Sequence, residues 1–396
     1  MNKGKTLAMI LLSALLSVAL VTILAGCGKQ VTHITTVEEL LAIKEGGNFV
    51  LDNDIDCGGK KWMGFNLNKD LTIDGNGHKI HNVEFVTEGN CFGLVAAAGS
   101  YLVFKNLGLE NFTINTNKTT SSSSIYAGGF VGLNNGEVKF ENCYAKGNIK
   151  VDIRNKSNHV GLFCGYVMDG IYENCLTDGE ISLHYDDFGF STATVYAGGF
   201  TGYGGWKNYA GGYSPDKYTN CISIVSIDVD TSLSMSWKTT TNVGGFQGFS
   251  GDFSAHNCIS APKKLYASTF VNNDVSVGGI KVIGTGKIGA FVGDSAYASN
   301  NSRNYYCSYN DETLSAAERA VQCSDYEKLN GRSVGVAVNL SKTIMLSADF
   351  LSGDYDYTDA NGEVKTAYAK FDGNVWNFGH MDGTTFVLPQ LKIFDK

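Results

Sequence analysis

Apolar and polar residues alternate along short segments of this chain, and similar segments return several times. In residues 143–151, 175–183 and 221–229, every second residue is small or apolar, while the residues between them vary freely. Such alternation is typical of a β-strand that buries one face. The pattern therefore predicts strands whose buried face carries residues such as Cys143 and Ile149.

A Gly-x-Phe-x-Gly phrase precedes each of these segments, and an Asn-Cys pair opens them. Complete copies of the phrase occupy residues 128–132, 161–165, 198–202 and 244–248, and their Asn-Cys pairs are residues 142–143, 174–175, 220–221 and 257–258. A degenerate copy, residues 289–293, leads to Asn304 and Cys307. Repeats at such periods predict stacked units, none of which can bury its apolar face alone. We therefore predict an all-β solenoid.

Each part of the repeat has a structural role in this prediction. The asparagine tolerates the left-handed backbone conformation of a sharp bend, and its amide can bond to the asparagine of the next repeat. The glycines let the chain bend, the phenylalanine fills the interior, and the cysteine packs as a small hydrophobic residue. The spacing between the asparagines is uneven. Loops of different length are therefore expected between the strands, and such loops usually carry the function of a solenoid.

Both ends of the predicted solenoid have candidate caps. Thr36 and Glu39 form a capping-box pattern, which predicts a short helix that closes the first repeat. Residues 355–371 predict a β-hairpin around the turn 359–362, and the apolar residues 375–391 are expected to close the other end. The solenoid is thus assigned to residues 35–310 and the C-terminal capping region to residues 311–396.

The first residues predict a targeting segment. Lys3 and Lys5 precede an apolar run, residues 7–23, and the sequence then reads Leu-Ala-Gly-Cys, ending at Cys27. These four residues resemble the lipobox of bacterial lipoproteins, in which cleavage precedes a cysteine that carries the lipid. The resemblance implies a signal peptide over residues 1–26, lipidation of Cys27, a tether over residues 27–34, and anchoring to a membrane of the bacterial cell envelope. A signal peptide without lipidation and an uncleaved membrane helix are the alternatives.

Composition narrows the classes of partner and cofactor. The chain has 396 residues, 48 glycines, 3 prolines and a net charge of −8, with no basic run. Nucleic acid is therefore not an expected partner, because phosphates need clustered Lys and Arg. Ten cysteines are present, but no Cys-x-x-Cys pair, and most of the cysteines follow the repeat. No zinc site and no other cofactor is expected.

The repeat also resembles a known family. Residues 129–136, Gly-Phe-Val-Gly-Leu-Asn-Asn-Gly, with residues 142–149, Asn-Cys-Tyr-Ala-Lys-Gly-Asn-Ile, are similar to the GLUG repeat of bacterial surface proteins. The flanking segments 49–56 and 74–80 and the closing Pro389-Gln-Leu391 look like the usual surroundings of that repeat. The resemblance implies a right-handed parallel β-helix over roughly residues 35–396. It does not imply the metallopeptidase activity found beside some GLUG repeats, because the His-Glu-x-x-His motif is absent.

Carboxylates alternate at Asp52, Asp54 and Asp56. On one strand they would face the same side and could bind a hard cation such as calcium. The alternative is a solvated face on the first repeat, which is also what the family resemblance implies, so no metal site is assigned.

Aromatic inserts are the stronger candidate for a binding site. Flat rings flanked by carboxylates and amides suit sugars, which offer apolar faces and hydroxyl edges; packing of the loops onto the solenoid is the alternative. The candidate ligand-binding residues are Tyr185, Asp186, Asp187, Tyr203, Trp206, Tyr209, Tyr213 and Trp237.

These observations predict a lipid-anchored protein of the bacterial cell surface. We expect it to be adhesin-like and to bind glycans or host surface molecules through its lateral loops. An enzyme acting on acidic polysaccharides, with Asp186 and Asp187 as its acids, and a purely structural envelope protein are the alternatives.

Overall fold

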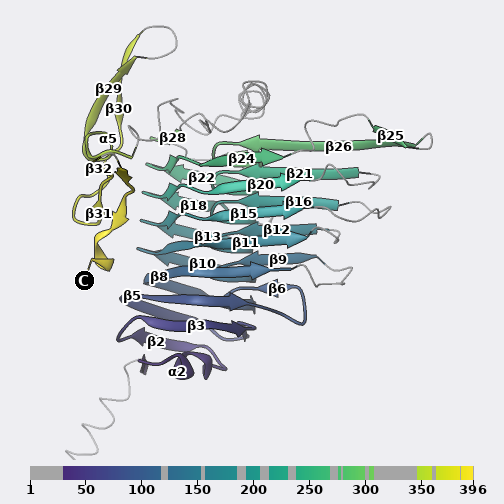
Figure 1. Ribbon diagram of the computed structural model, residues 1–396, viewed down its shortest axis with the longest axis vertical. Coiled ribbons are helices and arrows are strands. Elements are labelled where there is room, and N and C mark those ends of the chain that lie inside the picture. Colours follow the sequence, from purple (N-terminus) through teal and green to yellow (C-terminus); the bar gives the residue numbers. More distant parts are fainter. Residues whose placement is uncertain are drawn as a thin grey trace, which may run out of the picture.

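A computed structural model describes residues 30–116, 124–152, 157–184, 193–205, 214–230, 238–267, 275–277, 280–298, 303–306, 346–358, 363–383 and 385–395. Strands dominate the described chain, so the all-β prediction is confirmed. Most of the strands pair in parallel with the equivalent strand of the next repeat, and the pairs stack along one axis (Figure 1).

The larger sheet contains 21 strands. In chain order they are β1 (Val31–Ile34), β2 (Gly47–Leu51), β3 (Ile55–Trp62), β4 (Phe65–Leu67), β5 (Leu71–Phe85), β7 (Val95–Ala98), β8 (Leu102–Asn115), β10 (Val131–Glu141), β11 (Tyr144–Asp152), β13 (Cys164–Glu173), β14 (Leu176–Thr177), β15 (Glu180–His184), β17 (Thr201–Gly204), β18 (Asp216–Thr219), β19 (Ile222–Ser223), β20 (Ser226–Asp230), β22 (Gln247–His256), β23 (Ile259–Ser260), β24 (Lys264–Ala267), β27 (Val292–Ala298) and β28 (Tyr305–Tyr306).

A second sheet has 7 strands. They are β6 (Cys91–Phe92), β9 (Ile125–Gly128), β12 (Ser157–Gly161), β16 (Ala193–Gly198), β21 (Lys238–Gly244), β25 (Val275–Val277) and β26 (Ile280–Gly289). Only the β25–β26 pair in this sheet is antiparallel.

The Gly-x-Phe-x-Gly phrase lies where the chain passes from the second sheet to the larger one. Its phenylalanines stack through the interior, with ring centroids 5.0 Å apart between Phe130 and Phe163 and 4.9 Å apart between Phe200 and Phe246. The glycines are needed because the backbones approach closely at this corner. A Cβ at Gly202, for example, would collide with the backbone nitrogen of Val160. The predicted roles of Phe and Gly are therefore confirmed.

The asparagines form the predicted ladder. Asn142, Asn174, Asn220 and Asn257 all have φ between 51° and 53°, in the left-handed region. Each donates its amide N–H to the amide oxygen of the preceding asparagine, at 2.8 Å in the case of Asn257 and Asn220. A second, shorter ladder joins Asn111 to Asn82 at 2.6 Å.

The cysteines that follow the asparagines are free, fully buried thiols. Burial raises the pKa of Cys143 to about 12, and its Sγ donates to the carbonyl oxygen of Glu141 at 3.3 Å. The degenerate copy differs from the alignment we expected. Ile259 pairs with Tyr305, so Asn304 occupies the position of Cys258, and Arg303, with φ 55°, occupies that of Asn257. Cys307 lies outside the described residues.

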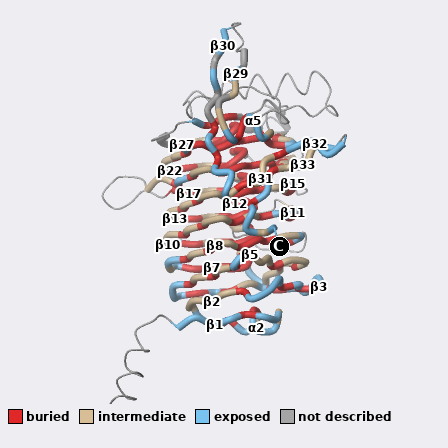
Figure 2. The backbone as a smooth tube through the Cα atoms, turned by 90° about the vertical axis from the view of Figure 1, so that its left-hand side faces the viewer, coloured by how far each residue is buried: buried red, intermediate tan, exposed pale blue. Residues whose placement is uncertain are grey.

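At the first repeat, the predicted helix forms as α2 (Val37–Leu41), with both hydrogen bonds of the Thr36–Glu39 capping box. It lies at the end of the stack, beside the exposed first strands (Figure 2). Residues 31–34, which we assigned to a tether, instead form β1 and pair in parallel with β2. The correction follows from backbone pairing, which a sequence of only four residues does not reveal.

The C-terminal residues are attached to the side of the stack. Their elements are α5 (Ala348–Ser352), β29 (Asp354–Thr358), β30 (Val364–Tyr368), β31 (Trp376–Asn377), β32 (His380–Asp382), β33 (Thr385–Val387), β34 (Gln390–Leu391) and the 3-10 helix η3 (Lys392–Phe394). The predicted hairpin is confirmed as the antiparallel pair β29–β30. The expectation that residues 375–391 close the end of the stack is wrong, because they run along its side toward β5 (Figure 1).

The C-terminal segment, residues 346–395, packs against the outer face of the larger sheet and forms an apolar cluster with it. The cluster is separate from the core inside the stack. Its buried members from the repeats are Leu176, Ile222, Ile224, Ile259, Ala261 and Tyr305, and those from the segment are Leu346, Phe350, Leu351, Ala369, Phe371, Trp376 and Leu391.

Candidate functional site

Polar side chains cover the outer face of β5, β8 and β11, beside the point where the C-terminal segment ends. Parallel pairing aligns these strands, so that Glu110 lies opposite Lys146 and Gly108 opposite Tyr144. Alternate residues of β11 point outward, which places Tyr144 and Lys146 on the same face. The side chains of three consecutive repeats therefore meet on one surface.

A cleft separates this surface from the C-terminal segment. Its main cavity measures about 500 Å³, and an adjoining cavity of about 390 Å³ shares Lys79, Tyr144 and Phe394 with it. The main cavity is lined from the repeats by Lys79, Glu110, Tyr144, Ala145, Lys146, Leu176, Asp178 and Ile224, and from the segment by Phe386, Leu388, Pro389, Gln390, Leu391 and Phe394. A cleft of this size matches those that bind small ligands.

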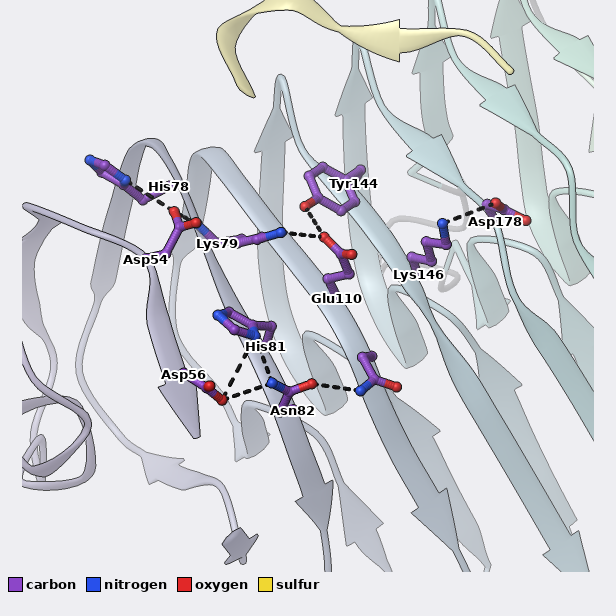
Figure 3. Close-up of polar contacts among 11 residues, drawn as sticks. Asp54, Asp56, His78, Lys79, His81, Asn82, Glu110, Tyr144, Lys146 and Asp178 are labelled. Carbon is purple, nitrogen blue, oxygen red and sulfur yellow. Dashed lines mark hydrogen bonds and ion pairs between the residues drawn. The ribbon is translucent and has the colours of Figure 1, made fainter. Parts of the chain in front are cut away.

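Glu110 is the centre of the hydrogen bonds in this cleft (Figure 3). Its Oε2 accepts from the Lys79 ammonium at 3.0 Å and from the Tyr144 hydroxyl at 2.9 Å. Partial burial alone would raise the pKa of Glu110, but the bonds from Lys79 and Tyr144 outweigh burial and hold the pKa below its ordinary value. Glu110 is therefore an ionised acceptor at neutral pH.

Tyr144 supplies an aromatic surface. Its ring lies over Gly108, where any Cβ would overlap the ring, and it meets Phe394 edge to face with centroids 4.7 Å apart. Burial first, and then the Glu110 carboxylate, raise the pKa of Tyr144. The hydroxyl is thus a neutral donor, with a ring beside it.

Asp178 forms the polar boundary of the cleft toward β14. The Lys263 ammonium lies 2.5 Å from its Oδ1, and the Lys146 ammonium lies 4.0 Å from its Oδ2. Figure 3 shows Lys146 and Asp178 on the same face as Tyr144 and Glu110. Beyond them the lining becomes apolar, with Leu176 and Ile224.

These groups suit binding better than acid–base catalysis. A general acid at neutral pH needs a carboxyl whose pKa is raised, and a phenolic base needs a hydroxyl whose pKa is lowered. Glu110 and Tyr144 are shifted in the opposite directions. They are instead an acceptor and a donor beside an aromatic ring, which is the combination that a hydroxyl-rich ligand requires.

The three alternating aspartates do not converge. β2 ends at Leu51 and β3 begins at Ile55, so Asp52 and Asp54 lie in the connection and only Asp56 lies on a strand. The expectation that one strand carries all three is therefore wrong. Asp52 Oδ1 lies 2.8 Å from His33 Nδ1, Asp54 Oδ1 lies 3.1 Å from His78 Nδ1, and Asp56 accepts from Asn82. Within the described residues, no group of three metal-ligating side chains could hold an ion.

Most of the predicted aromatic site falls on residues that the structure does not describe. Tyr185, Asp186, Asp187, Trp206, Tyr209, Tyr213, Trp237 and the lipidation site Cys27 lie outside the described residues. Tyr203 is described, and it lies on β17 rather than in an insert. Its ring stacks between Tyr166, at a centroid distance of 5.4 Å, and Phe249, at 4.8 Å. Both ring faces are covered, so a sugar could reach only the edge of Tyr203.

The sequence did not reveal the cleft, because its two walls lie more than 150 residues apart along the chain, Ile224 and Phe386 being the nearest lining residues in sequence. One signal was present. Ile222 and Ile224 alternate with the inward residues Cys221, Ser223 and Val225, and they are fully buried although they face away from the stack. An outward apolar pair predicts that something covers it.

Comparisons with known proteins leave the site to be judged by its geometry. No protein-family model matches the chain, and neither a curated protein nor a solved structure matches it. Among the helices of the described residues, none has the length and apolar character needed to cross a membrane.

Proposed function

We propose that this protein is a lipid-anchored β-helix of the bacterial cell envelope that binds glycans at the cleft between the outer sheet face and the C-terminal segment. The cleft carries the proposal, because it combines the Tyr144 ring with the Lys79–Glu110 pair and the Lys146–Asp178 pair. Sugars present hydroxyls to such donors and acceptors and an apolar face to such a ring.

The proposed fold is a right-handed parallel β-helix with GLUG-like repeats. In-register parallel pairing from repeat to repeat supports it, as do the asparagine ladder and the phenylalanine stack inside. The proposed location is supported by the Leu-Ala-Gly-Cys sequence that ends at Cys27. Labelled palmitate should be incorporated into the wild type in a bacterial host and not into Cys27→Ala. Equal labelling of the two proteins would exclude the anchor.

A glycan array followed by titration calorimetry tests the binding site. Tyr144→Ala removes the ring and the hydroxyl, and we expect the affinity for any glycan that the wild type binds to fall about threefold to tenfold. Lys150→Ala is the matched control, because Lys150 is exposed on the same strand but does not line the cleft.

Trp206→Ala separates the cleft from the lateral inserts. If Trp206→Ala loses binding and Tyr144→Ala does not, the glycan site is in the inserts and the cleft proposal is wrong. An array without any bound glycan would remove the glycan proposal itself, and shortened glycan products after incubation would identify an enzyme.

A further inference from the structure

Polar side chains interrupt the apolar interior at the level of β17, β18 and β22. Thr201 and Gln247 occupy the inward column that holds Val131, Cys164 and Val292 in the neighbouring repeats. Asp216 on β18 lies beside them, and all three polar side chains are fully buried. Such a cluster needs complete hydrogen bonding, because an unpaired polar group inside a protein is costly.

Asp216 has partners for both of its oxygens. Oδ1 accepts from the backbone N–H of Gly170 at 2.8 Å, and Oδ2 accepts from the Gln247 amide. Gly204 makes room for the carboxyl, since a Cβ there would overlap Oδ2. Among the described residues, none of the ion pairs involves Asp216.

The hydrogen bonds continue from Gln247 into the core. The Tyr218 hydroxyl donates to Gln247 Oε1 at 3.3 Å and lies 3.4 Å from Thr201 Oγ1. Thr201 Oγ1 in turn lies 2.6 Å from the Tyr172 hydroxyl, and either of these two groups can donate. Every member after Asp216 is a hydroxyl or an amide, so the direction of each bond in the chain can reverse.

The surroundings of Asp216 disfavour its charge. The titratable groups that face it are Cys164, Tyr166, Asp169 and Tyr172 on β13, Tyr218 on β18 and Asp252 on β22. None of them is a cation. Burial, and with it the Asp169 and Asp252 carboxylates, raises the pKa of Asp216 to about 8 against the opposing hydrogen bonds from Gln247 and Gly170.

We infer that Asp216 binds a proton inside the stack, and that gain or loss of this proton makes the stability of the repeats around β17 and β18 depend on pH. In the ionised form, the Gln247 amide nitrogen donates to Asp216 and its oxygen accepts from Tyr218. In the protonated form, the amide turns over. Its oxygen then accepts from the Asp216 hydroxyl, and its nitrogen donates to Tyr218.

The sign of the pH dependence follows from linkage. Below about pH 4, Asp216 is protonated in both the folded and the unfolded chain. Between about pH 4 and pH 8 only the folded chain keeps the proton. In that range the contribution of Asp216 raises the unfolding equilibrium constant about tenfold for each pH unit. Above the folded pKa both states are ionised, and the penalty stays constant.

Asp216→Asn tests the inference, because asparagine has the shape and hydrogen bonds of the neutral acid. Urea unfolding is to be measured from pH 5 to pH 9 for the wild type, Asp216→Asn and a control, Asp228→Asn. The Asp228 side chain is 41% exposed and pairs with Lys264. The ratio of the wild-type unfolding constant to that of Asp216→Asn should rise with pH and level off above pH 8. The ratio of the wild-type unfolding constant to that of Asp228→Asn should not rise with pH in this way.

Infrared spectroscopy provides a second test that does not depend on the variant folding. The folded wild type should show the carbonyl stretch of a protonated carboxylic acid at pH 6 and lose it near pH 8. Parallel unfolding curves for the wild type and Asp216→Asn, or a wild type without that band at pH 6, would overturn the inference.

Discussion

Two halves of the outer sheet face differ although their strands are built alike. Along β5, β8 and β11 the outward residues include Lys79, Glu110 and Lys146, and this half remains partly open. Along β14, β19 and β23 they are Leu176, Ile222 and Ile259, and the C-terminal segment covers them. The buried cysteines before β11, β14, β19 and β23 recur in both halves, whereas the outward residues differ, and the cleft lies at the boundary.

Reversing the polarity of the covered half should have the largest effect. Ile222→Glu places an unpaired carboxylate in a site that has no exposure and does not line the cleft. We expect a loss of more than about 4 kcal/mol in the free energy of unfolding, the range reached when a charge is buried without a partner. Lys150→Glu introduces a glutamate on the exposed face of β11 instead. It should change the free energy of unfolding by less than about 0.5 kcal/mol. Urea unfolding measures both, and equal losses would remove the distinction between the halves.

Removing one apolar side chain between the segment and the stack should lower the free energy of unfolding by somewhat less than a buried charge does. Phe350 is fully buried and meets Tyr305 edge to face, with centroids 5.1 Å apart. Phe350→Ala should lower the free energy of unfolding by about 3 kcal/mol, from lost burial and the cavity left behind. Limited proteolysis should then release the segment before the stack unfolds. Simultaneous cleavage throughout the chain would show that segment and stack form one cooperative unit.

In the open half, Glu110 should produce a small pH dependence of stability. Its folded pKa is lowered, so its contribution is present above the ordinary pKa of 4.5 and is lost as the pH falls below that value. Wild type and Glu110→Gln should therefore differ in urea midpoint at pH 6, and the difference should shrink toward pH 3. A constant difference would mean that the Glu110 charge does not stabilise this face.

The smallest effect is expected at the exposed end of the open half. Lys60 and Glu38 form an ion pair at 2.7 Å, with 48% and 72% of their side chains exposed. Lys60→Gln should leave the urea midpoint unchanged within error, because solvent and salt screen such pairs. A clear shift would show that the N-terminal helix depends on this pair.

Much of the repeat could be predicted because its features depend on local chemistry. Left-handed asparagines, glycines at crowded corners and stacked phenylalanines each follow from the chemistry of one residue and its copy in the next repeat. The same reasoning located the Thr36–Glu39 capping box and the hairpin of residues 355–371. It failed at Asn304, because only the pairing of Ile259 with Tyr305 shows which residue takes the cysteine position.

The candidate site could not be predicted in the same way. Glu110 has no unusual neighbours in sequence, and its partners Lys79 and Tyr144 are 31 and 34 residues away. The wall that carries Phe394 comes from the end of the chain. The aromatic inserts stand out from the rest of the sequence by their composition. The cleft instead consists of ordinary residues that strand pairing and the C-terminal segment bring together.

Periodicity and residue chemistry were enough to establish an all-β chain of repeats with asparagine, cysteine and phenylalanine in defined positions, since each of these depends on contacts with an adjacent copy. The placement of the C-terminal segment, the cleft beneath it and the buried Asp216 cluster depends on contacts between residues far apart in the chain. Such contacts are selected by which surfaces remain apolar after the stack has formed, and that is known only once the stack itself is in place.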